Sequence, residues 1–85
     1  MKYRVELTKS ATRELRRIPE PFHAAIIMKL RALEKDPRPA GCKKLVGESG
    51  YWRIRVGNYR VIYSISDVIK LVRVEHIGDR KDVYK

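Results

Sequence analysis

Arg53, Arg55 and Arg60 are the residues whose type and spacing best suit chemistry on a phosphate group. Side chains alternate across a strand with period two. The three arginines therefore share one face if the alternating runs on either side of Gly57 pair as a hairpin. Arg55 then lies directly opposite Arg60, and like charges that face each other across a ladder are destabilising. This arrangement predicts an anionic partner, and the alternative is a solvated outer face whose arginines keep the sheet soluble.

The hairpin is predicted from Gly57-Asn58, a pair suited to a two-residue turn of the primed type. Such a turn places Val56 opposite Tyr59 and sets the register of both strands. The second face of the hairpin is then apolar and predicts part of the core: Trp52, Ile54, Val56, Tyr59, Val61, Tyr63 and Ile65.

Cutting RNA without a metal requires an aligned 2′-hydroxyl, two proton transfers and stabilisation of the negative charge that grows on the phosphate. Fixed arginines meet the last requirement, because their planar forks hold two phosphate oxygens. Arg80 and Tyr84 in the tail are placed to close over such a site. A general base is not evident, since arginine and tyrosine titrate far above neutral pH. Glu48 and His76 are the candidates, although a packed strand histidine is the simpler interpretation of His76.

Composition limits the class of protein. The chain has 85 residues, a formal charge of +10 and a pI of about 10.1, which predict one domain over residues 1–85 with a polyanionic partner. That partner is nucleic acid, an acidic protein or an anionic membrane surface. No apolar run approaches the roughly 20 residues that span a bilayer. The single Cys42 makes no internal disulfide, and no Cys/His spacing suggests a metal or other cofactor, so a reducing, cytoplasmic location is expected.

The remaining pattern predicts an α+β fold. We expect a strand over residues 2–7, a helix capped by Thr8, and a second helix from Pro21 to about Lys35. Apolar residues in both phases of residues 68–77 predict a central strand covered on both sides. The expected architecture is an N-terminal strand, a helical hairpin and a three-stranded antiparallel meander that completes one twisted sheet.

Basic residues outside the hairpin enlarge the cationic surface. Lys43 and Lys44 precede the hairpin and extend its basic face towards Arg53. The polar side of the first helix carries three more cations, for which RNA contact and an ordinary solvated helix face both stay open: Arg13, Arg16 and Arg17.

The element order and two segments resemble the RelE/ParE superfamily of bacterial and archaeal toxins, and most closely its RelE-type messenger-RNA interferases. The segments are WRIRVGNYRVIY in the hairpin and IGDRKDVY near the end, and the resemblance covers essentially the whole chain. It implies a microbial ribonuclease-like fold and a toxin that cuts messenger RNA in the ribosomal A site. It also implies neutralisation by a RelB-like antitoxin, whose complex with the toxin contacts operator DNA and represses the operon.

The resemblance implies roles for individual residues. Arg53 and Arg55 stand where well-known members carry lysines that accept a proton and hold the transition state. Arg60 matches the phosphate-binding arginine, Arg80 the general acid or leaving-group stabiliser, and Tyr84 the tyrosine that stacks on the substrate base. The products would be a 2′,3′-cyclic phosphate and a 5′-hydroxyl. The residues expected to contact RNA or the ribosome are Lys43, Lys44, Tyr51, Lys81, Arg13, Arg16 and Arg17.

Two departures from the family pattern affect proton transfer. Asp79 stands where many relatives have histidine, which removes a candidate proton carrier. Arginine in place of lysine at positions 53 and 55 makes proton abstraction harder, because arginine holds its proton tightly. Two other functions therefore stay open: a ParE-type poison of DNA gyrase without nuclease activity, and an RNA- or ribosome-binding module that has lost cleavage.

Overall fold

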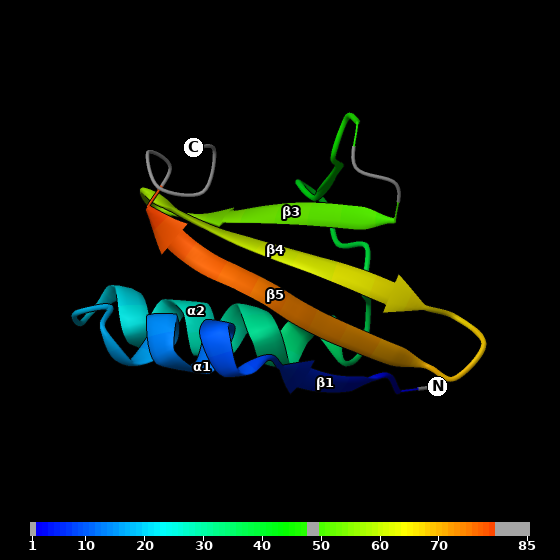
Figure 1. Ribbon diagram of the computed structural model, residues 1–85, viewed down its shortest axis with the longest axis horizontal. Coiled ribbons are helices and arrows are strands. Elements are labelled where there is room, and N and C mark those ends of the chain that lie inside the picture. Colours follow the sequence, from blue (N-terminus) through cyan, green and yellow to red (C-terminus); the bar gives the residue numbers. More distant parts are fainter. Residues whose placement is uncertain (1, 48–49, 80–85) are drawn as a thin grey trace.

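The computed structural model describes residues 2–47 and 50–79. Two helices lie against one side of a five-stranded sheet (Figure 1). In chain order the elements are β1 (Arg4–Leu7), α1 (Lys9–Arg16), α2 (Phe22–Leu33), β2 (Lys43–Lys44), β3 (Tyr51–Val56), β4 (Tyr59–Ser66) and β5 (Leu71–Asp79).

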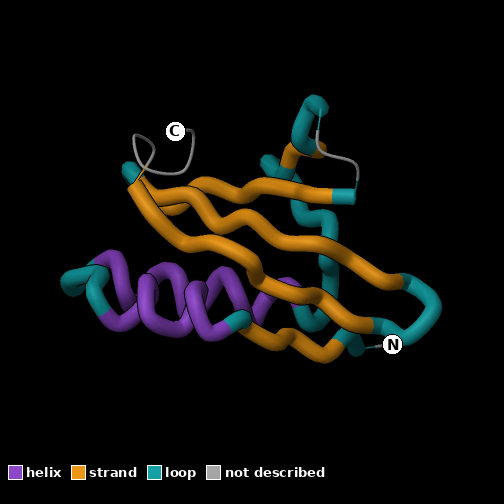
Figure 2. Tube along the Cα trace, in the orientation of Figure 1, coloured by secondary structure: helices purple, strands orange, loops and turns teal. Residues whose placement is uncertain are grey.

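The sheet has the strand order β1-β5-β4-β3-β2 (Figure 2). β1 pairs with β5 in parallel, and the other three pairings are antiparallel. The predicted α+β class, helical hairpin and antiparallel meander are confirmed. The two-residue β2 was not predicted: Lys43 pairs with Arg53 and Lys44 with Trp52, which extends the sheet beyond β3. Lysines before a glycine-spaced loop carry no strand signal, so this pairing comes from the register with β3.

The predicted hairpin register is confirmed. Val56 pairs with Tyr59, Arg55 with Arg60, and Arg53 with Ile62. Gly57 has a φ of +59°, a left-handed conformation that glycine adopts without strain. A Cβ at this position would lie 2.7 Å from Cε1 of Phe22 on α2. Both the turn and the close approach of Phe22 therefore favour glycine here.

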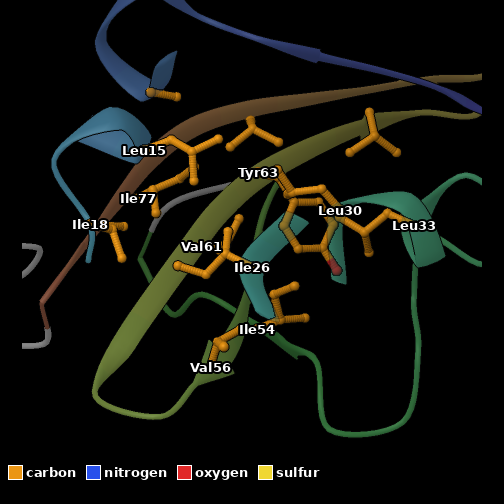
Figure 3. Close-up of a cluster of buried hydrophobic side chains, with 13 residues drawn as sticks. Leu15, Ile18, Ile26, Leu30, Leu33, Ile54, Val56, Val61, Tyr63 and Ile77 are labelled. Atoms are coloured by element: carbon orange, nitrogen blue, oxygen red, sulfur yellow. The ribbon is translucent and has the colours of Figure 1, made fainter. Parts of the chain in front are cut away.

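The helices form where the sequence predicts them. Thr8 caps α1, its side-chain oxygen accepting a hydrogen bond of 3.1 Å from the backbone N–H of Ala11. The apolar side chains of both helices meet those of β3, β4 and β5 in one core (Figure 3). Tyr63 is fully buried there and donates a hydrogen bond of 2.8 Å to the carbonyl of Pro37. Burial raises the pKa of its hydroxyl.

One expectation for the last strand is wrong. Within residues 68–77, Val68 and Ile69 belong to the turn before β5 and are 92% and 67% exposed. β5 itself alternates exposed and buried residues as far as Val74, so only one face is covered. The next core residue is Ile77, because a bulge shifts the register with β4 by one position. The mixed apolar phase therefore reflects an exposed turn and a bulge, and the strand is not covered on both sides.

An ion pair and a hydrogen bond to the same carboxylate join three segments that are distant in the sequence. Arg38, in the loop after α2, donates hydrogen bonds of 3.2 and 3.0 Å to the two carboxylate oxygens of Asp67 in the β4–β5 turn. The hydroxyl of Tyr3 donates to the same carboxylate. The Arg38 guanidinium also lies 5.2 Å from the centre of the Trp52 ring. The Arg38 and Tyr3 hydrogen bonds lower the pKa of Asp67 to about 2.

Replacing Gly57 by alanine should destabilise the fold more than the same change at Gly41. Both residues have positive φ, but a Cβ at position 41 meets nothing within 4 Å, whereas at position 57 it meets Phe22. We expect Gly41→Ala to lower the unfolding free energy by about 1–2 kcal/mol, from backbone strain alone. Gly57→Ala should lower it further, because the ring must move. Urea denaturation checks this, and equal losses would contradict the close approach of α2.

Replacing Asp67 by asparagine should change the pH dependence of stability. The pKa of this carboxyl is about 2 in the folded protein, against an ordinary value of 3.8. The stability contributed by the charged carboxylate is therefore present above pH 3.8 and is lost as the pH falls towards 2. Wild type should be more stable than Asp67→Asn at neutral pH, and the difference should vanish in acid. Glu34→Gln is the control, and thermal unfolding between pH 2 and 7 is the measurement.

Candidate nucleic-acid interface

Arg53, Arg55 and Arg60 lie together on the side of the sheet that faces away from the helices, and this surface is called the arginine face below. In β3 and β4, the residues that alternate with these arginines belong to the other side of the sheet, where their side chains join the core. Arg53 and Arg60 are only 8% and 7% exposed, whereas Arg55 is exposed. Both buried arginines are on inner strands and are paired on either side, so their backbones are held firmly.

The rows across the sheet define what surrounds the arginines. Arg60 lies between Arg55 on β3 and Gly78 on β5, so one side of its row has no side chain. Arg53 lies between Lys43 on β2 and Ile62 on β4. The pairing puts Lys43 on the arginine face, as predicted. Lys44 pairs with Trp52, whose ring packs against the core, so the expectation that Lys44 extends the same face is wrong. Ile62 is 6% exposed and gives the face a small apolar floor.

Tyr51 continues the same face towards the other end of the hairpin. It pairs with Ser64, which in turn pairs with the exposed Arg73 on β5. Tyr51 itself is half-buried beside the basic rows. Asp79 pairs with Tyr59, whose ring packs on the core side, so the register does not put Asp79 among the arginines.

His76 is not the packed strand histidine that the sequence predicts. Its side chain is 60% exposed and its Nδ1 lies 3.9 Å from Oε2 of Glu14 on α1. The other oxygen of Glu14 accepts a hydrogen bond of 2.9 Å from the backbone N–H of Ile77. Thr8 closes the same strand edge, its N–H donating to the carbonyl of Val74 at 3.0 Å. The start of α1 thus covers the edge of β5 beyond its pairing with β1.

Glu14 is the structural residue that sequence reasoning missed. It is the one acidic residue within Lys9–Arg16, and that isolation is the signal that could have drawn attention to it. Its hydrogen bond to a strand 63 residues away could not be read from local periodicity.

The three cations predicted on the first helix do not share one surface. Arg13 and Arg16 line an open groove of about 340 Å³ together with Lys9, Thr12 and Leu7. Arg17 lies outside this set, at the C-cap of α1. The groove belongs to the helical layer, whereas the arginine face is on the other side of the sheet.

Several predicted residues lie outside the described part of the chain: Glu48, Arg80, Lys81 and Tyr84. Among residues 2–47 and 50–79, no three His, Cys, Asp or Glu side chains gather to hold a metal ion. No helix of that part is long and apolar enough to cross a membrane.

Comparison with known proteins places this arrangement in a family. The family model described as ParE toxin of type II toxin-antitoxin system, parDE, matches residues 5–84. The chain belongs to the RelE/ParE toxin superfamily. Toxin RelE of Mycobacterium tuberculosis is 33% identical over 84 residues, which cover 98% of this chain and 87% of that protein.

Solved structures of RelE/ParE toxins share the fold. The toxin–antitoxin complex RelBE2 of M. tuberculosis contains a chain with a TM-score of 0.83 and 29% identity, covering 94% of this chain and 100% of that one. The archaeal RelE–RelB complex of Pyrococcus horikoshii OT3 gives the same TM-score and identity, covering 96% and 99%. The resemblance carried by the hairpin and the closing motif is thus confirmed, and this chain is a RelE-like toxin of the type II class.

Removing the hydrogen bond by which Glu14 closes the edge of β5 should destabilise this toxin. Glu14→Ala leaves the N–H of Ile77, a residue 1% exposed, without its acceptor. We expect a loss of about 1–3 kcal/mol in the free energy of unfolding, as for an unsatisfied buried donor. Glu14→Gln keeps an oxygen acceptor and should lose less. Urea denaturation of both variants is the measurement, and equal losses would show that the charge of Glu14 matters more than its hydrogen bond.

Proposed function

We propose that this RelE-like toxin is a metal-independent, ribosome-dependent endoribonuclease that cuts messenger RNA in the A site. The observation that carries the proposal is the arginine face, with Arg53 and Arg60 buried on inner strands beside the exposed Arg55. Packed arginines lose little freedom when they meet a phosphate. Partial burial also strengthens their interaction with it, because the local dielectric is lower than that of water.

The reaction that suits this face is attack of a ribose 2′-oxygen on the adjacent phosphorus. The 2′-hydroxyl loses its proton, the bond to the 5′-oxygen breaks, and that oxygen takes up a proton. The products are a 2′,3′-cyclic phosphate and a 5′-hydroxyl. Arg53, Arg55 and Arg60 would hold the phosphate oxygens as negative charge grows on them. Arg80 would stabilise the leaving oxygen and Tyr84 would align the substrate base by stacking.

The described residues of the arginine face provide positive charge for the phosphate, but they are poorly suited to accept the proton of the 2′-hydroxyl. The ring of His76 lies against Glu14 at the edge of β5. Arginine is a poor base, because its guanidinium group holds its proton tightly. We therefore assign most of the rate to stabilisation of the phosphate charge and to alignment of the 2′-hydroxyl, which the ribosome would help to provide.

The proposed partners follow from the charge and from the relatives. Two of the similar structures are named as RelE–RelB complexes, which supports a RelB-like antitoxin for this toxin. Such an antitoxin would be acidic and amphipathic, would wrap the helical hairpin and would offset part of the +10 charge. Operator DNA would be bound only through that complex, and the site of action would be cytoplasmic.

A second candidate is supported by the matching family model, whose description is a ParE toxin. In that function the same fold would poison DNA gyrase and would cut no RNA. A third is an RNA- or ribosome-binding module without cleavage, for which the Asp79 departure argues.

The test is primer extension on a reporter messenger in a reconstituted translation system, with and without ribosomes. Wild type should produce new 5′ ends at A-site codons only when ribosomes are present. Arg60→Gln should slow single-turnover cleavage by about 100- to 1,000-fold, as expected for loss of one transition-state contact. Arg73→Gln is the matched control, because this exposed arginine is on the same side of the sheet but two rows from Arg60.

The other outcomes select among the alternatives. Intact messenger together with blocked supercoiling in a gyrase assay would favour the ParE-type function. Intact messenger, normal gyrase activity and retained ribosome binding would indicate the binding module. Full cleavage by Arg60→Gln would remove the arginine face from the mechanism.

A further inference from the structure

The groove on α1 is a second cationic surface, separate from the arginine face. Lys9, Arg13 and Arg16 recur at i, i+4 and i+7, so they line one stripe of the helix. All three are exposed, and the groove that they border with Thr12 and Leu7 has a volume of about 340 Å³. At 1.5 Å per residue, the stripe spans roughly 10 Å of the helix axis.

These cations are not neutralised within residues 2–47 and 50–79, where none of the three takes part in an ion pair. The acidic residues closest in sequence have other partners. Glu14 accepts a hydrogen bond from the N–H of Ile77, and Glu6 lies 3.1 Å from Arg4. The groove therefore keeps its full positive charge for a ligand.

The lining of the groove favours a phosphate backbone over an acidic protein segment. The fully buried core of a protein interface is more apolar than its rim and is depleted of charged residues, whereas this groove offers one half-buried leucine, Leu7, among its cations. Its lining also contains no aromatic ring on which an unstacked base could lie. Double-helical RNA is recognised through its phosphates and 2′-hydroxyls, which charged and hydroxyl side chains can contact. Arginines and a threonine along a rigid helix fit that chemistry.

We propose that the α1 groove binds the backbone of a double-helical RNA segment, while the arginine face receives the single-stranded message. The helices and the sheet form separate layers of the domain (Figure 1). The groove is on α1, whereas the arginine face is on the side of the sheet that faces away from the helices, so one short RNA segment cannot occupy both. The inference rests on the proposed function, because a ribosome would supply the structured RNA beside the message. Lys9, Arg13 and Arg16 would set affinity for the ribosome and would take no part in the chemical step.

The test compares two triple variants that lose the same charge. The groove variant is Lys9→Gln/Arg13→Gln/Arg16→Gln. The control is Lys29→Gln/Arg31→Gln/Lys35→Gln, which changes three exposed cations outside the groove. Binding is measured to a short RNA duplex and to ribosomes carrying a 2′-deoxy A-site codon, which cannot be cut because the nucleophile is missing. Urea midpoints establish that both variants fold.

The groove variant should lose at least about tenfold in affinity for both probes, and its slope of log K against log salt should fall by about 2 to 3. The control should lose less than about threefold, with a slope change below about 1. Equal losses in the two variants would overturn the proposal, since net charge alone would then explain binding. Unchanged RNA binding with weakened antitoxin binding would also overturn it and would assign the groove to a protein.

A cleavage assay distinguishes failure of this inference from failure of the proposed function. At saturating ribosome concentration the groove variant should cut a ribose-containing message at the wild-type rate, and a slower rate would contradict a purely binding role. If wild type does not cut, the proposed function fails, but the duplex comparison still decides what the groove binds.

Discussion

Antiparallel pairing of β3 with β4 is the constraint on which both the core and the arginine face depend. One face of this hairpin packs Ile54, Val61 and Tyr63 under the helices, and the other presents the arginines. A slip of one residue would exchange the two faces. Burial of each large apolar side chain stabilises the register by about 1.5–3 kcal/mol, which exceeds the roughly 0.2–1 kcal/mol expected from a facing pair of like charges. The core therefore holds Arg55 and Arg60 opposite each other.

The rest of the small domain supports this hairpin from one side. A chain of 85 residues buries only about 60–65% of the surface that its unfolded form exposes. Both helices pack on the same face of the sheet and form one core with it. α1 also seals the edge of β5 through Thr8 and Glu14. The contact of Arg38 with Asp67 joins the loop after α2 to the far end of β4. Within residues 2–47 and 50–79 no helix covers the opposite face of the sheet, and it is the face that carries the arginines.

Acidic side chains in the described part of the chain contribute mainly to internal contacts. Asp67 accepts hydrogen bonds from Arg38 and Tyr3, Glu14 caps a strand edge, and Glu6 pairs with Arg4. This use of acids concentrates the unbalanced charge of +10 on surfaces that face outward. Two of the cationic surfaces that result are the arginine face on the sheet and the groove on α1. A polyanion of more than one strand or segment is the natural counterpart of two such surfaces.

The sequence by itself determined the features that depend on neighbours in the chain. The Gly57 turn and the alternation around it predicted the hairpin register, Thr8 predicted the start of α1, and the arginines followed from period two. Only the tertiary structure decided features that join distant segments. These include the short β2 pairing, the bulge that moves the core from Val74 to Ile77, and the cap that Glu14 provides.

The candidate site divides in the same way. Membership of the arginine face could be predicted, because it follows from alternation within one hairpin. The burial of Arg53 and Arg60 beside an exposed Arg55 could not, because burial depends on what packs around each position. Nor could the sequence separate Arg16, which lines the α1 groove, from its neighbour Arg17, which does not. Local periodicity states which residues share a face, and only packing between distant segments decides what each face can reach.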